Sequence, residues 1–213
     1  ANAAALASFQ AIVDEHARTP LDPTTLSQTL HGFGVTLLEN GQSEAGKQRI
    51  DEAIDVANRN RLPLIYASAM RSRGIVNAME GRDADADHDF AKAGIAMELA
   101  GDTLGQAQNE ASLAGTLIVR HRYAEASALH DRAIARLERF PPGDFLLAAY
   151  GNQIYLQLAM LDPRAALATA QHARDVFARA GNARTDRTFD LHEIRALIAA
   201  GLYARAERQL AAM

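Results

Sequence analysis

Large apolar residues recur three or four positions apart along most of the chain, which is the spacing that lines one face of an α-helix. Ile50, Ile54 and Ala57 follow this spacing, and so do Ile134 and Leu137. Turn-forming residues separate such stretches. Asp162-Pro163 is typical of a helix N-terminus, whereas Pro141-Pro142-Gly143 ends a helix. The pattern therefore predicts a succession of helices.

The same pattern repeats every 40 residues without an insertion. The repeat is clearest from the turn that begins at Gly41, whose equivalents are Gly81, His121, Leu161 and Gly201. Three columns placed around this turn hold mostly small residues. The first contains Gly34, Gly74, Ala114, Ile154 and Ile194; the second Gly46, Ala86, Ala126, Ala166 and Ala206; the third Ala53, Ala93, Ala133 and Ala173, with Met213 ending the series. Residues seven apart share one helix face, so we expect close helix–helix packing along these columns.

Each repeat is thus predicted to be a pair of helices joined by short turns. The first helices of the pairs are predicted near residues 25–39, 64–80, 104–120, 145–160 and 186–200. The second helices are predicted near 43–60, 83–100, 123–139, 163–180 and 203–213. An additional helix near 3–17 is expected to cap the N-terminal end.

The second-helix segments GQSEAGKQRIDEAI, RYAEASALHDRAI and LYARAERQL resemble those of the tetratricopeptide repeat (TPR). The resemblance covers about residues 25–213. It departs in length, since that repeat usually has about 34 residues, and it is similar to a longer variety carried by bacterial regulatory proteins. The fourth repeat departs further at Gln153, Ile154 and Gln157. HEAT repeats share the length and are the structural alternative.

The resemblance implies an all-α fold, a right-handed superhelical solenoid of antiparallel helix pairs. Residues 1–213 are expected to form a single TPR-like array of about five repeats. Its expected parts are the capping helix 1–18 and the repeats 25–63, 64–103, 104–143, 144–184 and 185–213, the last truncated.

The composition of the chain bears on which kinds of partner we expect. The net charge is −4 with a pI of about 6.0, whereas a nucleic-acid partner would call for a basic surface. The absence of cysteine excludes disulfides and thiolate metal sites but is compatible with any compartment. The sequence has no apolar run as long as a membrane span and no signal peptide, so we expect a cytoplasmic protein that binds neither membranes nor nucleic acid. The chain begins without methionine and stops in a helical pattern, which suggests a piece of a larger protein.

No pattern indicates catalysis. The stretch GRDADADHDF lacks the glycine and glutamate that a calcium loop needs, so its aspartates are interpreted as the first turn of a helix. His130 falls in a core-facing column, where a hydrogen-bonded structural histidine is expected. Glycine-rich phosphate loops and nucleophile elbows are absent from the sequence. We therefore expect no enzyme activity, no catalytic residue, no cofactor and no metal.

In TPR arrays the first helices line a concave groove, and the resemblance carries that surface over to this chain. The implied partner-binding residues are Gln28, His31, Glu39, Arg71, Ile75, Gln108, Gly115, Gly151, Tyr155, Leu191 and Arg195. Val35 and Met79 occupy further inner positions of the first two repeats. Arg132, Arg136 and Arg139 form a separate row, interpreted as a solvated face or, alternatively, a site for an acidic peptide.

The leading hypothesis is a non-catalytic scaffold that binds a protein or peptide segment. By analogy it would be the regulatory or sensory part of a larger bacterial signalling protein, such as a diguanylate cyclase or transcriptional regulator. The partner could also be a flanking domain of the same protein. The alternatives are a sensor that binds a small molecule or short peptide in the groove, and a homodimer.

Overall fold

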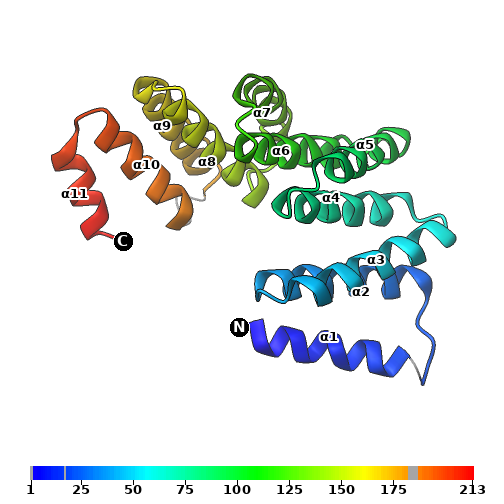
Figure 1. Ribbon diagram of the computed structural model, residues 1–213. Helices are drawn as coiled ribbons and strands as arrows, with labels where there is room; N and C mark the ends of the chain where they lie inside the picture. Colours follow the sequence, from blue (N-terminus) through cyan, green and yellow to red (C-terminus); the bar gives the residue numbers. More distant parts are fainter. Residues whose placement is uncertain (1, 17, 182–186) are drawn as a thin grey trace. The chain divides into compact units, whose positions relative to one another are not determined.

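A computed structural model describes residues 2–16, 18–181 and 187–213, and this part of the chain contains eleven α-helices and no β-strand. The helices follow one another as hairpin-like pairs (Figure 1). Their bounds are α1 (Asn2–His16), α2 (Pro23–Glu39), α3 (Ser43–Arg59), α4 (Pro63–Met79), α5 (Asp83–Leu99), α6 (Thr103–Val119), α7 (Tyr123–Leu137), α8 (Asp144–Ala159), α9 (Pro163–Arg179), α10 (Arg187–Ala199) and α11 (Tyr203–Ala211).

The predicted helix set is confirmed, with every boundary within two residues. Residues 17 and 186, which were included in two predicted helices, lie outside the described residues. Helix α2 starts earlier than predicted because Asp22 caps it: its carboxylate accepts hydrogen bonds from the backbone N–H groups of Thr24 and Thr25, each at 3.0 Å. Pro23, which precedes the predicted start near residue 25, is the first helical residue, where its missing N–H costs nothing.

The helices also keep a period half as long as the 40-residue repeat. From α2 to α7, each helix begins 20 residues after the one before, and α9 and α11 return to this register. Helices α2 to α6, α8 and α10 end in the same way. After α2, for example, the N–H of Gln42 donates to the Leu37 carbonyl, and that of Gly41 donates to the Leu38 carbonyl, both at 2.9 Å. This is the Schellman arrangement, which satisfies the last carbonyls of a helix.

The Schellman arrangement places one residue of each turn in the left-handed region. Glycine fills this position at five turns, with φ between 67° and 77°. Arg61, His121 and Leu161 fill it at three others, with φ of 55°, 57° and 62°. A side chain is strained in this conformation, so these three turns are held by the helices on either side.

The chain divides into two compact units, residues 1–109 and 110–213, with the division inside α6. In the first unit α2 packs on α1, α3 and α4, and α4 packs on α3 and α5. In the second, α8 packs on α7, α9 and α10, and α10 packs on α9 and α11. Within each unit a helix therefore contacts its own pair and the next pair, as expected for stacked repeats. That the whole chain forms a single array stays a prediction.

The residues of the three columns are buried, except that Met213, which ends the third column, is 43% exposed. Ala53, Ala93, Ala133 and Ala173 are completely inaccessible to solvent. The first repeat is the tightest, because a Cβ atom added to Gly34 would lie 2.7 Å from Ile50 Cγ1 and 2.8 Å from the Gly46 carbonyl oxygen. A Cβ on Gly46 would in turn lie 2.7 Å from Leu38 Cγ. Contact this close between α2 and α3 explains why both columns are glycine here.

Candidate functional site

The first unit contains an apolar hollow of about 450 Å³ between the C-terminal halves of α2 and α4. Its walls are mainly aliphatic and its rim is polar. The lining residues are Val35, Leu38, Glu39, Gly41, Ser43, Ser72, Ile75, Val76, Met79 and Glu80. Met79, the last residue of α4, is 81% exposed, as is usual for the apolar residues that end helices in this chain, but Met79 also lines the hollow. The hollow therefore offers apolar surface that the chain itself does not cover.

The rim of the hollow is negatively charged. Among the described residues that line it, Glu39 and Glu80 alone are charged, and neither α2 nor α4 has a basic residue in its last turn. Both helices end at this rim, and a helix C-terminus carries a partial negative charge. Carboxylates at such ends lack the favourable dipole interaction that a cation would have there.

The two rim carboxylates differ in their partners. Glu80 accepts a hydrogen bond from Lys47 Nζ at 3.0 Å and pairs with Arg82. The hydrogen bond from Lys47 is the largest influence that lowers the pKa of Glu80, and it outweighs the opposing effect of burial. Glu39 is exposed, and no side chain among the described residues pairs with its carboxylate. Glu39 thus supplies the uncompensated charge of the rim.

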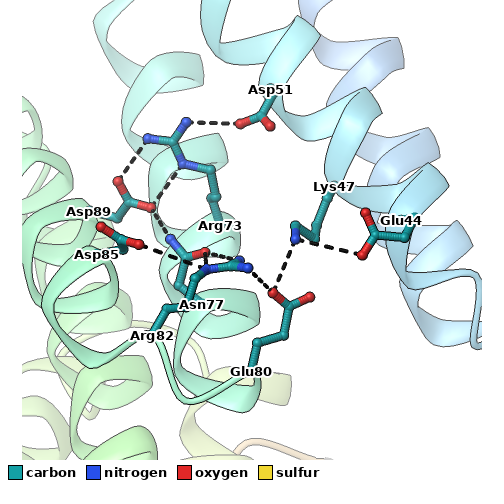
Figure 2. A network of polar contacts seen from close by, with 9 residues as sticks. All are labelled: Glu44, Lys47, Asp51, Arg73, Asn77, Glu80, Arg82, Asp85 and Asp89. Carbon is teal, nitrogen blue, oxygen red and sulfur yellow. Dashed lines mark hydrogen bonds and ion pairs between the residues drawn. The ribbon is translucent and has the colours of Figure 1, made fainter.

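Glu80 also belongs to a polar network that joins α3, α4 and α5 beside the hollow (Figure 2). At its centre Asp89, only 2% exposed, accepts hydrogen bonds from Arg73 Nε at 2.9 Å and Nη2 at 2.8 Å. Asn77 donates a third at 2.8 Å, and Arg73 Nη1 also donates to Asp51 at 2.8 Å. The hydrogen bonds that Arg73 donates to Asp89 are the main reason that the pKa of Arg73 is raised. This network fixes the wall of the hollow that α4 provides.

In the first unit the structure brings some of the predicted partner-binding residues together. Glu39 and Ile75 line the hollow, as do the inner positions Val35 and Met79. His31 Nε2 lies 2.9 Å from Ser72 Oγ, and burial, followed by the charge of Arg71, lowers the pKa of His31 to about 4.

Other predicted residues of the first unit lie away from the hollow's lining. Arg71 is only 9% exposed, and its Nη1 donates to Gln108 Oε1 at 3.2 Å. Burial lowers the pKa of Arg71 to about 10. Gln28 is exposed on α2. Arg71 is therefore largely enclosed within its own unit, although the resemblance implied that it binds a partner.

In the second unit the predicted residues lie on α6, α8 and α10. Gly151 is buried beneath His192, whose Cδ2 would lie 3.2 Å from an added Cβ. The Tyr155 ring is 42% exposed and meets the His192 ring edge to face, with centroids 6.2 Å apart. Leu191 and Arg195 are exposed, and Gly115 is half-buried. Whether any of these positions binds a partner stays a prediction.

A second hollow, of about 430 Å³, lies among α7, α8 and α9, and both polar and apolar residues line it. Glu138 at its edge pairs with the hydroxyl of Tyr150 and lies 2.9 Å from His172 Nε2. Burial alone would raise the pKa of Glu138, but hydrogen bonds from Tyr150 and His172 lower it below its ordinary value. Burial and the same hydrogen bond raise the pKa of Tyr150. These groups satisfy one another and present no nucleophile paired with a base.

One expectation about histidine is wrong. His130 is completely buried, as its core-facing column predicted, but neither ring nitrogen has a hydrogen-bond partner within the part of the chain described. Burial lowers the pKa of His130 to about 4, so the ring is neutral at neutral pH. Its repeat equivalents Ile50, Phe90 and Ala170 are apolar, which explains why the surroundings offer it no partner.

The remaining charged motifs have structural partners. Asp83 and Asp85 lie in the first turn of α5 as interpreted, while Asp89 is the buried carboxylate of the network. Arg136 and Arg132 lie 3.3 Å and 3.8 Å from Glu110, so the arginine row is partly neutralised. Among the described residues no group of three or more histidine or acidic side chains could hold a metal ion. No helix in the described ranges is both long and apolar enough to span a membrane.

Sequence reasoning missed part of the hollow. Leu38, Val76 and Glu80 line it but were not chosen, because the inner positions were taken from the family's pattern alone. The sequence feature that could have identified these three residues is their position next to predicted ones. Leu38 and Val76 directly neighbour the chosen Glu39 and Ile75, and Glu80 directly follows Met79 at the end of α4.

Comparison with solved structures shows what this arrangement resembles. The crystal structure of BtubC (BKLC) from P. vanneervenii has a TM-score of 0.75 at 16% identity, covering 100% of this chain and 90% of that one. Two crystal structures of a Podosopora anserina chain with nearly identical TPR-like repeats, of the kinesin light chain type, also align at 14% identity. Their TM-scores are 0.67 for one, covering 89% of this chain and 93% of that one, and 0.66 for the other, covering 88% and 92%.

The chain has a TPR-like fold. No model of a known protein family matches the sequence, and no curated protein matches it. At identities this low the TPR-like likeness concerns architecture, so partners and activities have to be argued from this chain's own surfaces.

Proposed function

We propose that this TPR-like chain is a non-catalytic scaffold that binds a segment of a protein partner. The observation that carries the proposal is the apolar hollow between α2 and α4, with the 81% exposed Met79 at its edge. Apolar surface rimmed by polar groups is typical of protein interaction sites. An exposed groove between helices also suits an amphipathic helix or an extended peptide.

Site-specific photocrosslinking tests this proposal. A benzophenone amino acid would replace Met79, at the end of α4, and in a matched control Leu99, at the end of α5. Both side chains are more than 80% exposed, but only Met79 lines the hollow. We expect a specific protein adduct from position 79 in lysate of the source organism and none from position 99. The same adducts from both positions, or none from position 79, would contradict the proposal.

A second candidate is a sensor for a small molecule. The hollow's volume of about 450 Å³ supports it, because small-molecule sites commonly measure about 300–1,000 Å³. A ligand that binds the native state raises the melting temperature. A thermal-shift screen of metabolites on the parent and on an Ile75→Asp variant would separate the two functions, since only a ligand of the hollow loses its effect in the variant.

The wider setting remains a proposal from resemblance. A regulatory part of a bacterial signalling protein, such as a diguanylate cyclase or transcriptional regulator, is consistent with the long variety of the repeat. Cytoplasmic location, occupation of the groove by a flanking domain, and a homodimer belong to the same proposal. Sequencing the complete reading frame would show whether a signalling domain accompanies the repeats, and light scattering at several concentrations tests the homodimer.

A further inference from the structure

We propose that the partner segment presents a large apolar side chain to the hollow between α2 and α4, next to an arginine or lysine that pairs with Glu39. This inference rests on the proposed function and names the chemistry of the partner. The ligand we propose is a peptide segment of another protein, because the apolar walls and the charged rim together fit two neighbouring side chains, one apolar and one basic.

The apolar half of the recognition comes from the walls. Val35 and Leu38 lie one helical turn apart on α2, and Ile75 and Met79 lie one turn apart on α4. Val76 at the base is only 5% exposed, whereas Met79 at the edge is 81% exposed. A side chain entering here would bury apolar surface on both helices. Removing a Leu, Phe or Met side chain from water in this way stabilises the complex.

The charged half comes from the rim. None of the lining residues is basic, and Glu39 is exposed without a cationic partner at the end of α2. Glu80 is already neutralised by Lys47 and Arg82 (Figure 2), so it cannot supply the unpaired charge. A cation beside Glu39 would interact with that carboxylate and with the negative ends of α2 and α4. An acidic segment would meet the same groups with repulsion, so the rim selects against it.

Peptide selection followed by charge reversal tests the inference. A phage-displayed library of random dodecapeptides would be selected on the full chain, and an enriched peptide would be labelled for anisotropy titration. We expect enriched sequences with a large apolar residue adjacent to arginine or lysine. Glu39→Lys should weaken the labelled peptide about tenfold or more, and replacing the peptide's basic residue by glutamate should restore binding to that variant.

Glu98→Lys is the matched control. Glu98 is exposed and lies near the end of α5, so its reversal changes the net charge and the helix end in the same way without touching the hollow. We expect this variant to bind the peptide nearly as the parent does. Equal losses for Glu39→Lys and Glu98→Lys, or enrichment of acidic peptides, would overturn the inference.

The two proposals fail in different ways. If the peptide is lost on Ile75→Asp but is unaffected by Glu39→Lys, the hollow binds segments and only the basic neighbour is wrong. If neither substitution matters and no adduct forms at position 79, the proposed function itself is wrong. Circular dichroism of each variant against the parent shows whether the helices are intact, so a loss of binding can be assigned to the surface.

Discussion

At the scale of single residues, the three left-handed turn positions that are not glycine carry backbone strain that is unrelated to packing. Leu161 occupies the left-handed position after α8 with φ of 62° and is 88% exposed, so its side chain contributes little there. Leu99, by contrast, ends α5 inside the helix and is 85% exposed. The same substitution should therefore have opposite effects at these two leucines.

We expect Leu161→Gly to raise the free energy of unfolding by about 0.5–1 kcal/mol, because glycine adopts positive φ without steric strain. Leu99→Gly should lower it by a similar amount, because glycine is a poor helix former. Urea titration followed by circular dichroism measures both. Destabilisation by Leu161→Gly would show that the turn is not strained.

Because of His130, the free energy of unfolding should fall as the pH is lowered. Its folded pKa of about 4 lies below the ordinary value of 6.5, so the unfolded state takes up the proton first as the pH falls. The contribution of neutral, buried His130 to the free energy of unfolding is fully present above about pH 6.5 and is lost progressively toward pH 4. For this group alone the loss between pH 7 and pH 5 is about 2 kcal/mol.

His130→Phe, which copies Phe90 of the preceding repeat, should remove this contribution and flatten the stability profile between pH 7 and pH 5. His31 has a similarly lowered pKa and should account for part of the remaining slope. Urea midpoints across this pH range provide the measurement. An unchanged slope in the variant would mean that His130 is protonated in the folded state.

At the scale of helices, the first pair depends on the absence of two β-carbons. Gly46→Ala would place a methyl group 2.7 Å from Leu38 Cγ and 2.9 Å from the Gly34 carbonyl oxygen. We expect a loss of about 1–3 kcal/mol through overpacking. Gly94→Ala on α5 is the control, because its Cβ would meet only Asn109 Nδ2, at 3.4 Å. That variant should gain about 0.5–1 kcal/mol from helix propensity, and thermal melts would show shifts of opposite sign.

The buried carboxylate of Asp89 on α5 needs the guanidinium of Arg73 on α4 as its partner, so the stability of the protein depends on Arg73. Arg73→Met should cost about 3 kcal/mol or more, because it leaves a buried charge without its principal partner. Asp51→Asn, which alters the exposed end of the same network, should change stability by no more than about 0.5 kcal/mol. Chemical denaturation measures the free energy of unfolding of both variants. Similar losses in the two would mean that the buried Asp89 carboxylate is not stabilised by Arg73.

At the scale of the whole molecule, repeat packing should confine a perturbation to its neighbourhood. Helices α2 to α4 contact one another directly, and α8 to α11 form contacts of their own in the second unit. Hydrogen exchange of Gly46→Ala should therefore quicken in α2, α3 and α4 while α8 to α11 keep the parental rates. A uniform increase would indicate that both units open together.

The repeat, its helices and its buried columns could be predicted because close helix contact admits few residue types. Gly46 and Ala53 lie on the packed face of α3 and leave little choice at their equivalents. The hollow could not be predicted, because it depends on how Leu38, Val76 and Met79 from two helices fill the space between them. The pairing of Glu80 with Lys47 on a different helix likewise follows from distance in space rather than from sequence spacing.

The regular step between helix starts has a genetic consequence. Tandem duplication of the DNA that encodes any 40 consecutive residues of the regular region would add one helix pair and leave every buried column in register. Duplication of half that length would add a single helix, and the first and second helices after it would exchange roles. Recombination is therefore expected to lengthen or shorten this gene in units of one pair, and length variants should differ by multiples of 40 residues.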